Sequence, residues 1–298
     1  MRLVSYDAAA RPGDEPVWRA GVLVGDQVVD AALAGAGLAA PEALASVRGI
    51  LALGPDVAAE LGRAAAGGDA AVGAVGAVRL GPPVPDPDKL FCIGLNYVAH
   101  AEEVELETRA TPTVFMKFRN SLIGSGAPIR VPPTATAQVD YEGELAVVIG
   151  RRGARLTVDE ALGVVAGAMP LNDVSARDLQ FSTTQWTAGK AVDTFAPCGP
   201  ALVLVDEIED LGNLRIATRV NGETLQDAST SQMIFSVAEL VAHVSTFTTL
   251  EPGDIIATGT PEGVGFTREP PVFLGDGDVV EVEIEGLGTL RNPVEFEG

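Results

Sequence analysis

Short apolar runs that follow one another without intervening helices dominate the chain from about residue 89 onward. Runs of this kind are typical of buried strands, and directly successive strands favour an antiparallel or mixed sheet over a doubly wound one. They occupy residues 90–93, 144–149, 201–205, 214–220, 254–257 and 279–284. Asn221-Gly222 predicts a tight hairpin turn after one of them. The pattern therefore predicts an α+β, mainly β fold.

Residues 1–80 have a pattern of their own, with fewer strands and several short helical stretches. Residues 18–29 predict two short strands joined at Gly25-Asp26. Short helical stretches are predicted at residues such as 41–53 and 55–66, and helical periodicity appears again at 157–165 and 236–246. Residues 81–88 hold four prolines in eight positions, which excludes a helix interior and predicts a stiff linker. We therefore expect a small N-terminal α/β domain at 1–80, a linker at 81–88 and a larger domain at 89–298.

The composition is that of a globular and very acidic protein. The 298 residues are 47% hydrophobic and 20% charged, which excludes general disorder. Asp and Glu number 41 against 20 Lys and Arg, so the formal net charge is −21. Such a chain lacks the basic face that nucleic-acid binding requires, and it is poorly suited to an anionic membrane. An anionic small molecule would need a local positive site, made by a metal ion or by a few placed Arg and Lys.

The cysteines and the apolar segments indicate the cellular environment to expect for the protein. Two cysteines, Cys92 and Cys198, are too few for a disulfide framework or a thiolate zinc site. The first residues lack an apolar signal core, and no apolar run reaches the roughly 18 residues of a membrane span. We therefore expect a soluble protein in a reducing, cytoplasmic setting.

The sharpest acidic feature is Asp140-Tyr141-Glu142-Gly143-Glu144, at the start of a predicted strand. Side chains two positions apart share one face of a strand, so Glu142 and Glu144 point the same way. Two like charges side by side are destabilising unless a cation lies between them. An exposed strand start in a very acidic protein is the alternative explanation.

Asp173 offers a third carboxylate, since it lies where the apolar stretch 161–171 gives way to a turn or helix. Three carboxylates with water make a site for a hard cation such as Mg²⁺, Mn²⁺ or Ca²⁺. Alternatively, Asp173 is an N-cap among ordinary surface residues. If the residues after it are helical, Arg177 and Gln180 lie three positions apart on one face.

His100 is one of two histidines in the chain and comes soon after a predicted strand. On a helical turn, Glu103 can hydrogen-bond its imidazole, which raises the basicity of the ring as in a general base. An incidental surface pair would show the same spacing. The other histidine, His243, lies in a predicted helix, and we assign it a structural role.

Lysine is rare, with Lys89, Lys117 and Lys190 against 17 arginines. A lysine in such a chain indicates a place that needs a compact charge with a tunable pKa. Lys190 follows a glycine near Asp193, whereas Lys89 beside the proline-rich linker needs no special explanation. Residues 258–265 form a glycine-rich loop, which permits a close backbone approach to a ligand or makes a plain turn.

Seven motifs in unbroken order make residues 90–298 resemble the fumarylacetoacetate hydrolase family. The motifs are GLNYVAHAEE, PTVFMKF, VDYEGELAVVIG, NDVSARDLQ, WTAGKAVDTFAPCGP, VNGE and GDIIATGTPEGVG. The small N-terminal unit fits bacterial members that carry a short extra domain. Within the family, the chain is similar to the branch that includes oxaloacetate tautomerases.

The resemblance implies the family's mixed β-roll, a homodimer, and a resident Mg²⁺ or Mn²⁺, with Ca²⁺ as a substitute in a crystal. The implied metal ligands are Glu142, Glu144 and Asp173. The implied catalytic groups are a dyad on a mobile lid segment, His100 and Glu103, and the active-site lysine, Lys190. The implied substrate contacts are Arg177, Gln180, Thr260 and Lys117. The chain departs from the family's usual pattern at Ala168-Met169-Pro170 and at Ala191, which bears on specificity.

The function implied first is metal-dependent hydrolysis of a C–C bond in a small anionic 1,3-diketo or 2-oxo acid, of the acylpyruvate or fumarylacetoacetate type. The metal would stabilise the enolate, the dyad would activate a water, and Lys190 and Arg177 would neutralise the substrate. The alternative keeps the metal and enolate without the water, as in an oxaloacetate tautomerase or decarboxylase or a 2-hydroxy-dienedioate isomerase. A more remote alternative is a non-catalytic metal-binding dimer.

Overall fold

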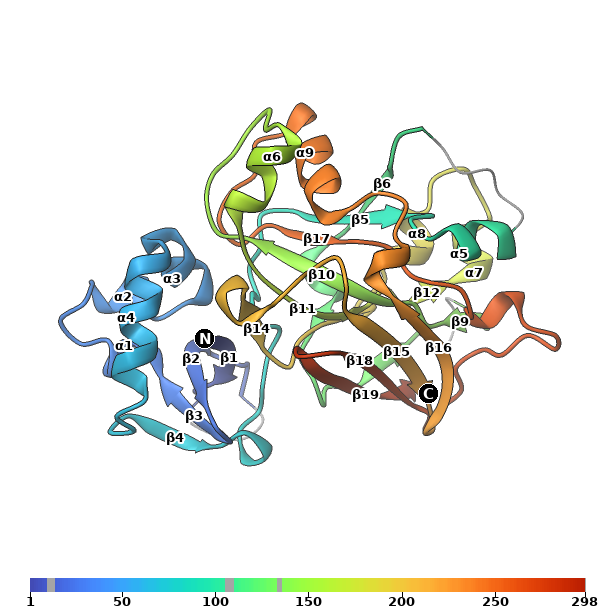
Figure 1. Ribbon diagram of the computed structural model, residues 1–298. Helices are drawn as coiled ribbons and strands as arrows, with labels where there is room; N and C mark the ends of the chain where they lie inside the picture. Colours follow the sequence, from blue (N-terminus) through green and yellow to red (C-terminus); the bar gives the residue numbers. More distant parts are fainter. Residues whose placement is uncertain (10–13, 105–109, 133–135, 298) are drawn as a thin grey trace.

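The computed structural model describes residues 1–9, 14–104, 110–132 and 136–297. Its largest element is a mixed sheet of ten strands (Figure 1). In spatial order these are β4 (Ala71–Ala74), β3 (Gln27–Asp30), β2 (Trp18–Val24), β1 (Arg2–Asp7), β14 (Leu202–Leu204), β11 (Val165–Asn172), β10 (Gly143–Ile149), β17 (Ile255–Ala257), β5 (Leu90–Gly94) and β6 (Thr113–Lys117). β17 and β5 pair in parallel, and the other neighbours are antiparallel.

A second sheet of five strands packs against the middle of the first. In spatial order its strands are β16 (Glu223–Ser229), β15 (Arg215–Val220), β18 (Val279–Ile284), β19 (Gly288–Phe296) and β8 (Ile129–Val131). β10 and β11 contact β15, β18 and β19. Two short strand pairs are β9 (Val139–Asp140) with β12 (Ser175–Ala176), and β7 (Leu122–Ile123) with β13 (Ala196–Pro197). The prediction of an α+β, mainly β fold with a mixed sheet is confirmed.

The helices are short and lie around the sheets. The α-helices are α1 (Ala31–Ala34), α2 (Pro41–Leu44), α3 (Val47–Leu53), α4 (Pro55–Ala65), α5 (Val98–Glu103), α6 (Val158–Ala161), α7 (Arg177–Gln180), α8 (Thr187–Lys190) and α9 (Val237–Phe247). The 3₁₀ turns are η1 (Val75–Ala77), η2 (Arg119–Ser121), η3 (Leu162–Val164), η4 (Val205–Glu207), η5 (Thr230–Gln232) and η6 (Gly265–Thr267). Of the helices in the described part of the chain, none combines the length and apolarity that a membrane crossing needs.

The hydrophobic pattern locates most elements but misjudges some of their ends. All six predicted apolar runs contain strands, and α9 matches the predicted helix at 236–246. The predicted helix at 157–165 stops at Val164 because β11 begins at the next residue. The predicted helix at 41–53 is interrupted at Ser46, whose hydroxyl caps α3 by accepting the N–H of Gly49. The hairpin predicted at Asn221-Gly222 is confirmed, since these residues join β15 to β16. The pattern does not reveal β19, which is partly exposed and carries charged residues.

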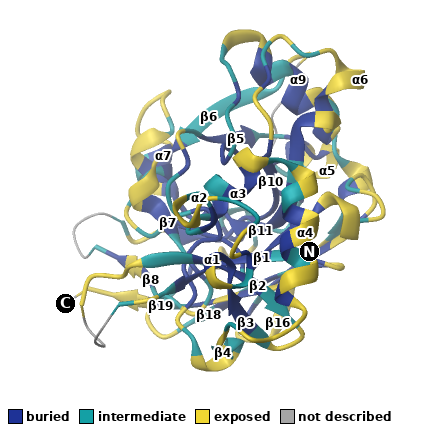
Figure 2. Cartoon of the chain, turned by 90° about the vertical axis from the view of Figure 1, so that its left-hand side faces the viewer, coloured by how far each residue is buried: buried dark blue, intermediate teal, exposed yellow. Residues whose placement is uncertain are grey.

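β10 explains why a buried strand reads as a continuous apolar run. Every residue of this strand is buried, and successive side chains point to opposite faces of the sheet. Leu145 and Val147 belong to a core cluster that includes α9, whereas Ala146 and Val148 belong to a cluster that extends to the N-terminal helices. Figure 2 shows these buried strands at the centre, with exposed residues on the helices and loops around them.

Residues 1–80 share both a sheet and a core with the rest of the chain. β1 pairs with β14, so that Leu3 lies opposite Leu202. The same apolar cluster holds Leu3 and Leu61 from the N-terminal part and Leu90 and Leu202 from the remainder. The division of the chain at residues 81–88 stays a prediction, and the shared core suggests how to test it.

Leu3→Ala is expected to lower the free energy of unfolding of the whole chain by about 2–5 kcal/mol, because it leaves a cavity in the shared core. The matched control is Leu33→Ala on α1, where the residue is 66% exposed, and there a change within about 0.5 kcal/mol is expected. Denaturant unfolding followed by the fluorescence of Trp18 and Trp186, one in each part, measures both. Two separate transitions, only one of them shifted by Leu3→Ala, would contradict a single cooperative core.

Candidate active site

Three buried carboxylates meet at one end of the β10–β11 pair. Glu142 precedes β10, Glu144 lies in it, and Asp173 follows β11. The strands are antiparallel with Gly143 opposite Asn172, so the start of one lies beside the end of the other. The N–H of Asp173 donates to the carbonyl of Glu142 over 2.8 Å. One oxygen of each carboxylate lies within 4.8 Å of the others, so the structure brings the three predicted ligands together.

Three buried cations surround this cluster. Lys190 Nζ donates to Glu142 Oε2 over 2.8 Å and to Asp173 Oδ2 over 2.9 Å. Lys117 Nζ donates to Asp173 Oδ1 over 2.6 Å, and Arg177 Nη1 lies 2.7 Å from Glu142 Oε1. Burial of a charge is costly unless it is paired and hydrogen-bonded, and these contacts meet that requirement for Glu142 and Asp173.

The ion pairs around Glu142 and Lys190 keep both of these side chains charged. Burial by itself would raise the pKa of Glu142, but the charges of Lys190 and Arg177 outweigh it and lower the pKa to about 2. Burial would likewise lower the pKa of Lys190, but Asp173 and Glu142 outweigh it and raise that pKa. At neutral pH, Glu142 is therefore a carboxylate and Lys190 an ammonium.

Unlike Glu142 and Asp173, Glu144 forms no ion pair with a described lysine or arginine. Its Oε2 accepts the N–H of Gly259 over 2.8 Å, and no lysine or arginine of the described residues lies within ion-pair distance of it. Burial, followed by the charges of Asp173 and Glu142, raises the pKa of Glu144 well above its ordinary value. A cation between the three carboxylates would relieve this repulsion, and buried carboxylate oxygens are the ligands that Mg²⁺, Mn²⁺ and Ca²⁺ prefer. The donor set therefore fits a divalent metal ion.

Asp140 holds Arg177 in place, a role that the sequence pattern does not indicate. Asp140 Oδ2 accepts from Arg177 Nε over 2.9 Å and from the N–H of Phe266 over 3.1 Å, and Oδ1 accepts from the N–H of Gly265 over 2.8 Å. One fully buried carboxylate thus ties the guanidinium to the loop that contains η6. The only signal for it in the sequence is its place two residues before Glu142.

α5 brings His100 and Glu103 into contact, with 3.1 Å between Nδ1 and Oε2. The other oxygen of Glu103 accepts from the N–H of Gly263 over 3.0 Å and from the Thr267 hydroxyl over 2.8 Å. Burial would raise the pKa of Glu103, but these bonds, that to His100 foremost, outweigh it and lower the pKa. An ionised Glu103 can only accept, so Nδ1 of His100 carries a proton and Nε2 is the free ring nitrogen. That this segment, α5, is a mobile lid stays a prediction, and residues 105–109, which follow it, lie outside the described residues.

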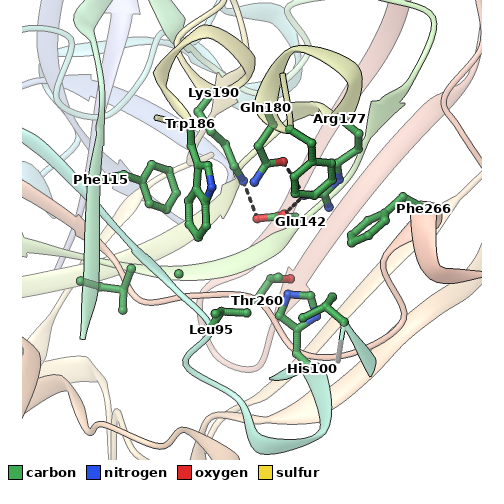
Figure 3. Close-up of a pocket in the computed structure, with 14 residues that line it drawn as sticks. Leu95, His100, Phe115, Glu142, Arg177, Gln180, Trp186, Lys190, Thr260 and Phe266 are labelled. Atoms are coloured by element: carbon green, nitrogen blue, oxygen red, sulfur yellow. Dashed lines mark hydrogen bonds and ion pairs between the residues drawn. The ribbon is translucent and has the colours of Figure 1, made fainter. Parts of the chain in front are cut away.

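A cavity of about 350 Å³ brings these groups together (Figure 3). Its polar lining residues are His100, Glu142, Arg177, Gln180, Lys190 and Thr260. Its aromatic lining residues are Phe115, Phe181, Trp186 and Phe266. The polar set consists entirely of residues that the sequence predicts for the site. The aromatic set is missed, since Phe115 and Trp186 lie in motifs noted only for their lysines.

Like Arg177 and Gln180, which contact each other, the other two predicted substrate contacts are engaged by groups of the protein. Lys117 lies behind Asp173 rather than in the cavity lining, where its Nζ also donates to the carbonyl of Val174 over 2.9 Å. The Thr260 hydroxyl donates to the carbonyl of Gly143 over 3.0 Å and accepts from Gln226 Nε2 over 2.8 Å. The part of each in substrate binding stays a prediction.

The mainly β fold holds a cluster of three buried carboxylates and a His–Glu pair, and Glu142 from the cluster and His100 from the pair line one cavity. This is the architecture of the fumarylacetoacetate hydrolase family of enzymes, and the chain belongs to this family. Residues 89–295 match the family model described as fumarylacetoacetate (FAA) hydrolase C-terminal. The resemblance drawn from the seven motifs is thereby confirmed.

Individual relatives differ in their reported activities. Oxaloacetate tautomerase Fahd2a, mitochondrial, of Rattus norvegicus is 49% identical over 213 residues, which are 71% of this chain and 68% of the relative. The structure of fumarylacetoacetate hydrolase from psychrophilic Exiguobacterium antarcticum is 36% identical, covers 100% of both chains and gives a TM-score of 0.84. Maleylpyruvate hydrolase from Sphingobium sp. SYK-6, in complex with manganese(II) ion and pyruvate, is 31% identical with a TM-score of 0.79, again over 100% of both chains.

Glu144→Gln is expected to weaken Mn²⁺ and Mg²⁺ binding by at least about 10-fold, because it removes a charged ligand and leaves the shape of the site unchanged. Metal that binds only the folded state raises the melting temperature, so thermal unfolding against metal concentration measures the affinity. The matched control is Glu262→Gln, on the glycine-rich loop and outside the carboxylate cluster. Equal affinities in Glu144→Gln and wild type would exclude this cluster as the metal site.

Metal binding is expected to weaken as the pH falls through the raised pKa of Glu144. The sign follows because the metal binds the ionised carboxylate and must displace the proton that this carboxyl retains in the metal-free protein. Titration calorimetry in buffers of different ionisation enthalpy measures the protons released for each metal ion bound. An affinity independent of pH over the range in which the protein stays folded would contradict the prediction.

Proposed function

We propose that the protein is a divalent-metal-dependent keto–enol tautomerase of small 2-oxo acids, with oxaloacetate as a substrate. The observation that carries the proposal is the 49% identity over 213 residues to a relative named as an oxaloacetate tautomerase. Identity to the two hydrolases of known structure is lower, at 36% and 31%. The hydrolase function expected first from the sequence becomes the second candidate.

The carboxylate cluster would hold the metal through Glu142, Glu144 and Asp173. When bound there, Mg²⁺ or Mn²⁺ supplies a Lewis acid that stabilises negative charge on an enolate oxygen. The charge of the site can be summed from its side chains. With Asp140 included there are four buried carboxylates, and they lie beside three buried cations, Lys117, Arg177 and Lys190. With all of them ionised, a divalent ion leaves one positive charge in excess. That excess suits an anionic 2-oxo acid in a chain of net charge −21.

Gln180 and Arg177 are suited to orient the substrate. Arg177 Nη1 donates to Gln180 Oε1 over 2.9 Å, which leaves the Gln180 amide N–H₂ free to donate to a substrate carboxylate. Lys190, from α8, lies on the same side of the cavity (Figure 3). These groups would fix the carboxylate and keto oxygens, so that C3 of the substrate lies toward His100.

His100 would move the proton. Interconversion of the keto and enol forms transfers one proton between C3 and the oxygen on C2, and nothing else is gained or lost. With Nδ1 held by Glu103, Nε2 of His100 would take the proton from C3 and pass it to the oxygen on C2, and in the ketonisation direction it would carry the proton from that oxygen back to C3. A general base of this kind typically contributes 10²–10⁴-fold to a rate, in order-of-magnitude terms.

C–C hydrolysis is favoured by a specific observation as well. The maleylpyruvate hydrolase of similar fold carries manganese and pyruvate, and the His100–Glu103 pair is equally suited to deprotonate a water. A non-catalytic metal-binding dimer would not need a histidine oriented by a carboxylate at its cavity. The homodimer and the cytoplasmic setting stay predictions.

His100→Gln is expected to lower kcat for ketonisation of enol oxaloacetate by about 10²-fold or more, because the proton-transferring nitrogen is lost. The matched control is His243→Gln, since the other histidine lies on α9 outside the cavity lining. Decay of the enol absorbance is followed with Mg²⁺ and again after EDTA treatment. Metal-dependent loss of the diketone absorbance of acetylpyruvate, without effect on oxaloacetate, would replace the tautomerase by the hydrolase. Wild-type kcat in His100→Gln would remove the histidine from the mechanism.

A further inference from the structure

The cavity is lined by two kinds of surface, and the proposed tautomerisation of oxaloacetate uses one of them. The polar edge consists of Glu142, Arg177, Gln180 and Lys190. The aromatic walls are Phe115 with Trp186 on one side of the cavity and Phe266 on the opposite side, as Figure 3 shows. Oxaloacetate has a charged carboxylate at each end and nothing flat and apolar to place between such walls.

The first aromatic wall is fixed in position. The rings of Trp186 and Phe115 meet edge to face, with centroids 5.4 Å apart and planes at 70°. Gly94, at the end of β5, leaves the space for the indole, since a Cβ on this residue would lie 2.6 Å from a Trp186 ring atom. Lys190 Nζ lies 5.1 Å from the Phe115 ring centroid, which links this wall to the polar edge. Trp186 thus presents a preformed apolar face.

The opposite wall is fixed by different contacts. The Arg177 guanidinium lies over the Phe266 ring, 4.4 Å from its centroid, and the Phe181 ring packs at 5.5 Å. The backbone N–H of Phe266 donates to Asp140, the carboxylate that also holds Arg177. The position of the Phe266 ring and the position of the Arg177 side chain therefore depend on each other.

The two cations that contact the walls, Lys190 at Phe115 and Arg177 at Phe266, are already paired with a carboxylate of the protein. Among the described lining residues, the lysine and the arginine are Lys190 and Arg177, both on the polar edge and both paired with Glu142. Aromatic faces carry a negative quadrupole, which disfavours a carboxylate over the ring and favours another ring, stacked or edge to face. The space between the walls suits a flat uncharged group better than a charged one.

We propose that the cavity also binds and tautomerises arylpyruvates, 2-oxo acids with an aromatic ring on C3. The inference rests on the proposed function, since it uses the same polar edge for the 2-oxo acid and the same proton transfer by His100. The enol loses the proton on its C2 oxygen and gains one on C3, so the keto acid has the same composition and no co-reactant is consumed. The aryl ring lies between Trp186 and Phe266.

Phenylpyruvate is the probe, and 2-oxobutanoate, apolar but not flat, is the comparison substrate. Enol decay with Mg²⁺, corrected for the rate with EDTA-treated protein, is expected to give a kcat/KM for phenylpyruvate at least about 10-fold above that for 2-oxobutanoate. Trp186→Ala is expected to remove most of this preference. Phe118→Ala, at a residue 52% exposed and outside the cavity lining, is the matched control and is expected to keep it.

Binding is measured apart from turnover by fluorescence. Trp18→Phe leaves Trp186 as the sole indole of the chain, and phenylpyruvate with Mg²⁺ is expected to quench its emission at the concentrations that saturate turnover. Turnover of oxaloacetate without turnover of phenylpyruvate overturns this inference and leaves the proposed function intact. Turnover of neither overturns both. Phenylpyruvate turnover that is unchanged in Trp186→Ala, or absence of quenching, overturns the placement of the ring between the walls.

Discussion

The structure depends on one electrostatic constraint: four carboxylates are removed from water at a single place. Asp140, Glu142, Glu144 and Asp173 are each at most 6% exposed. Such a cluster is tolerable only with cations beside it, and these come from β6 and, much later in the sequence, from α7 and α8. The fold around the site is therefore the arrangement that brings these elements to one end of β10 and β11.

In the buried carboxylate cluster and the cations beside it, the groups proposed to bind a 2-oxo acid are distinct from those that would decide which reaction it undergoes. The proposed metal ligands and the polar edge would serve any reaction that passes through the enolate of a 2-oxo acid, and the relatives on this scaffold are named as a tautomerase and two hydrolases. The reactions differ in what reaches C3 or the distal carbonyl, a proton or a water. In the proposed mechanism, that choice would depend on the contacts of His100 and on the walls that limit the rest of the cavity.

The sequence predicts the site residues whose type and local spacing are required by the chemistry. It does not predict contacts between residues that become neighbours only in the folded chain. Spacing alone pairs His100 with Glu103 and aligns Glu142 with Glu144, and the apolar runs mark the buried strands. Local spacing cannot show that Phe115 and Trp186 meet, because β6 and α8 come together only in the folded chain. Nor can it show that Asp140 serves an arginine instead of a metal, since both uses require the same buried carboxylate.

The parallel pairing of β17 with β5 has a consequence for folding kinetics. Residues 255–257 pair with residues 90–92, and Gly259, just after β17, donates to Glu144. Contacts between residues so far apart in sequence are slow to form, because a long loop must close before they are made. On the ribosome, the acidic cluster is therefore synthesised well before the segment that completes its surroundings. The hydrogen bond that Glu144 accepts from Gly259 can therefore form only after the last strands of the large sheet have been made.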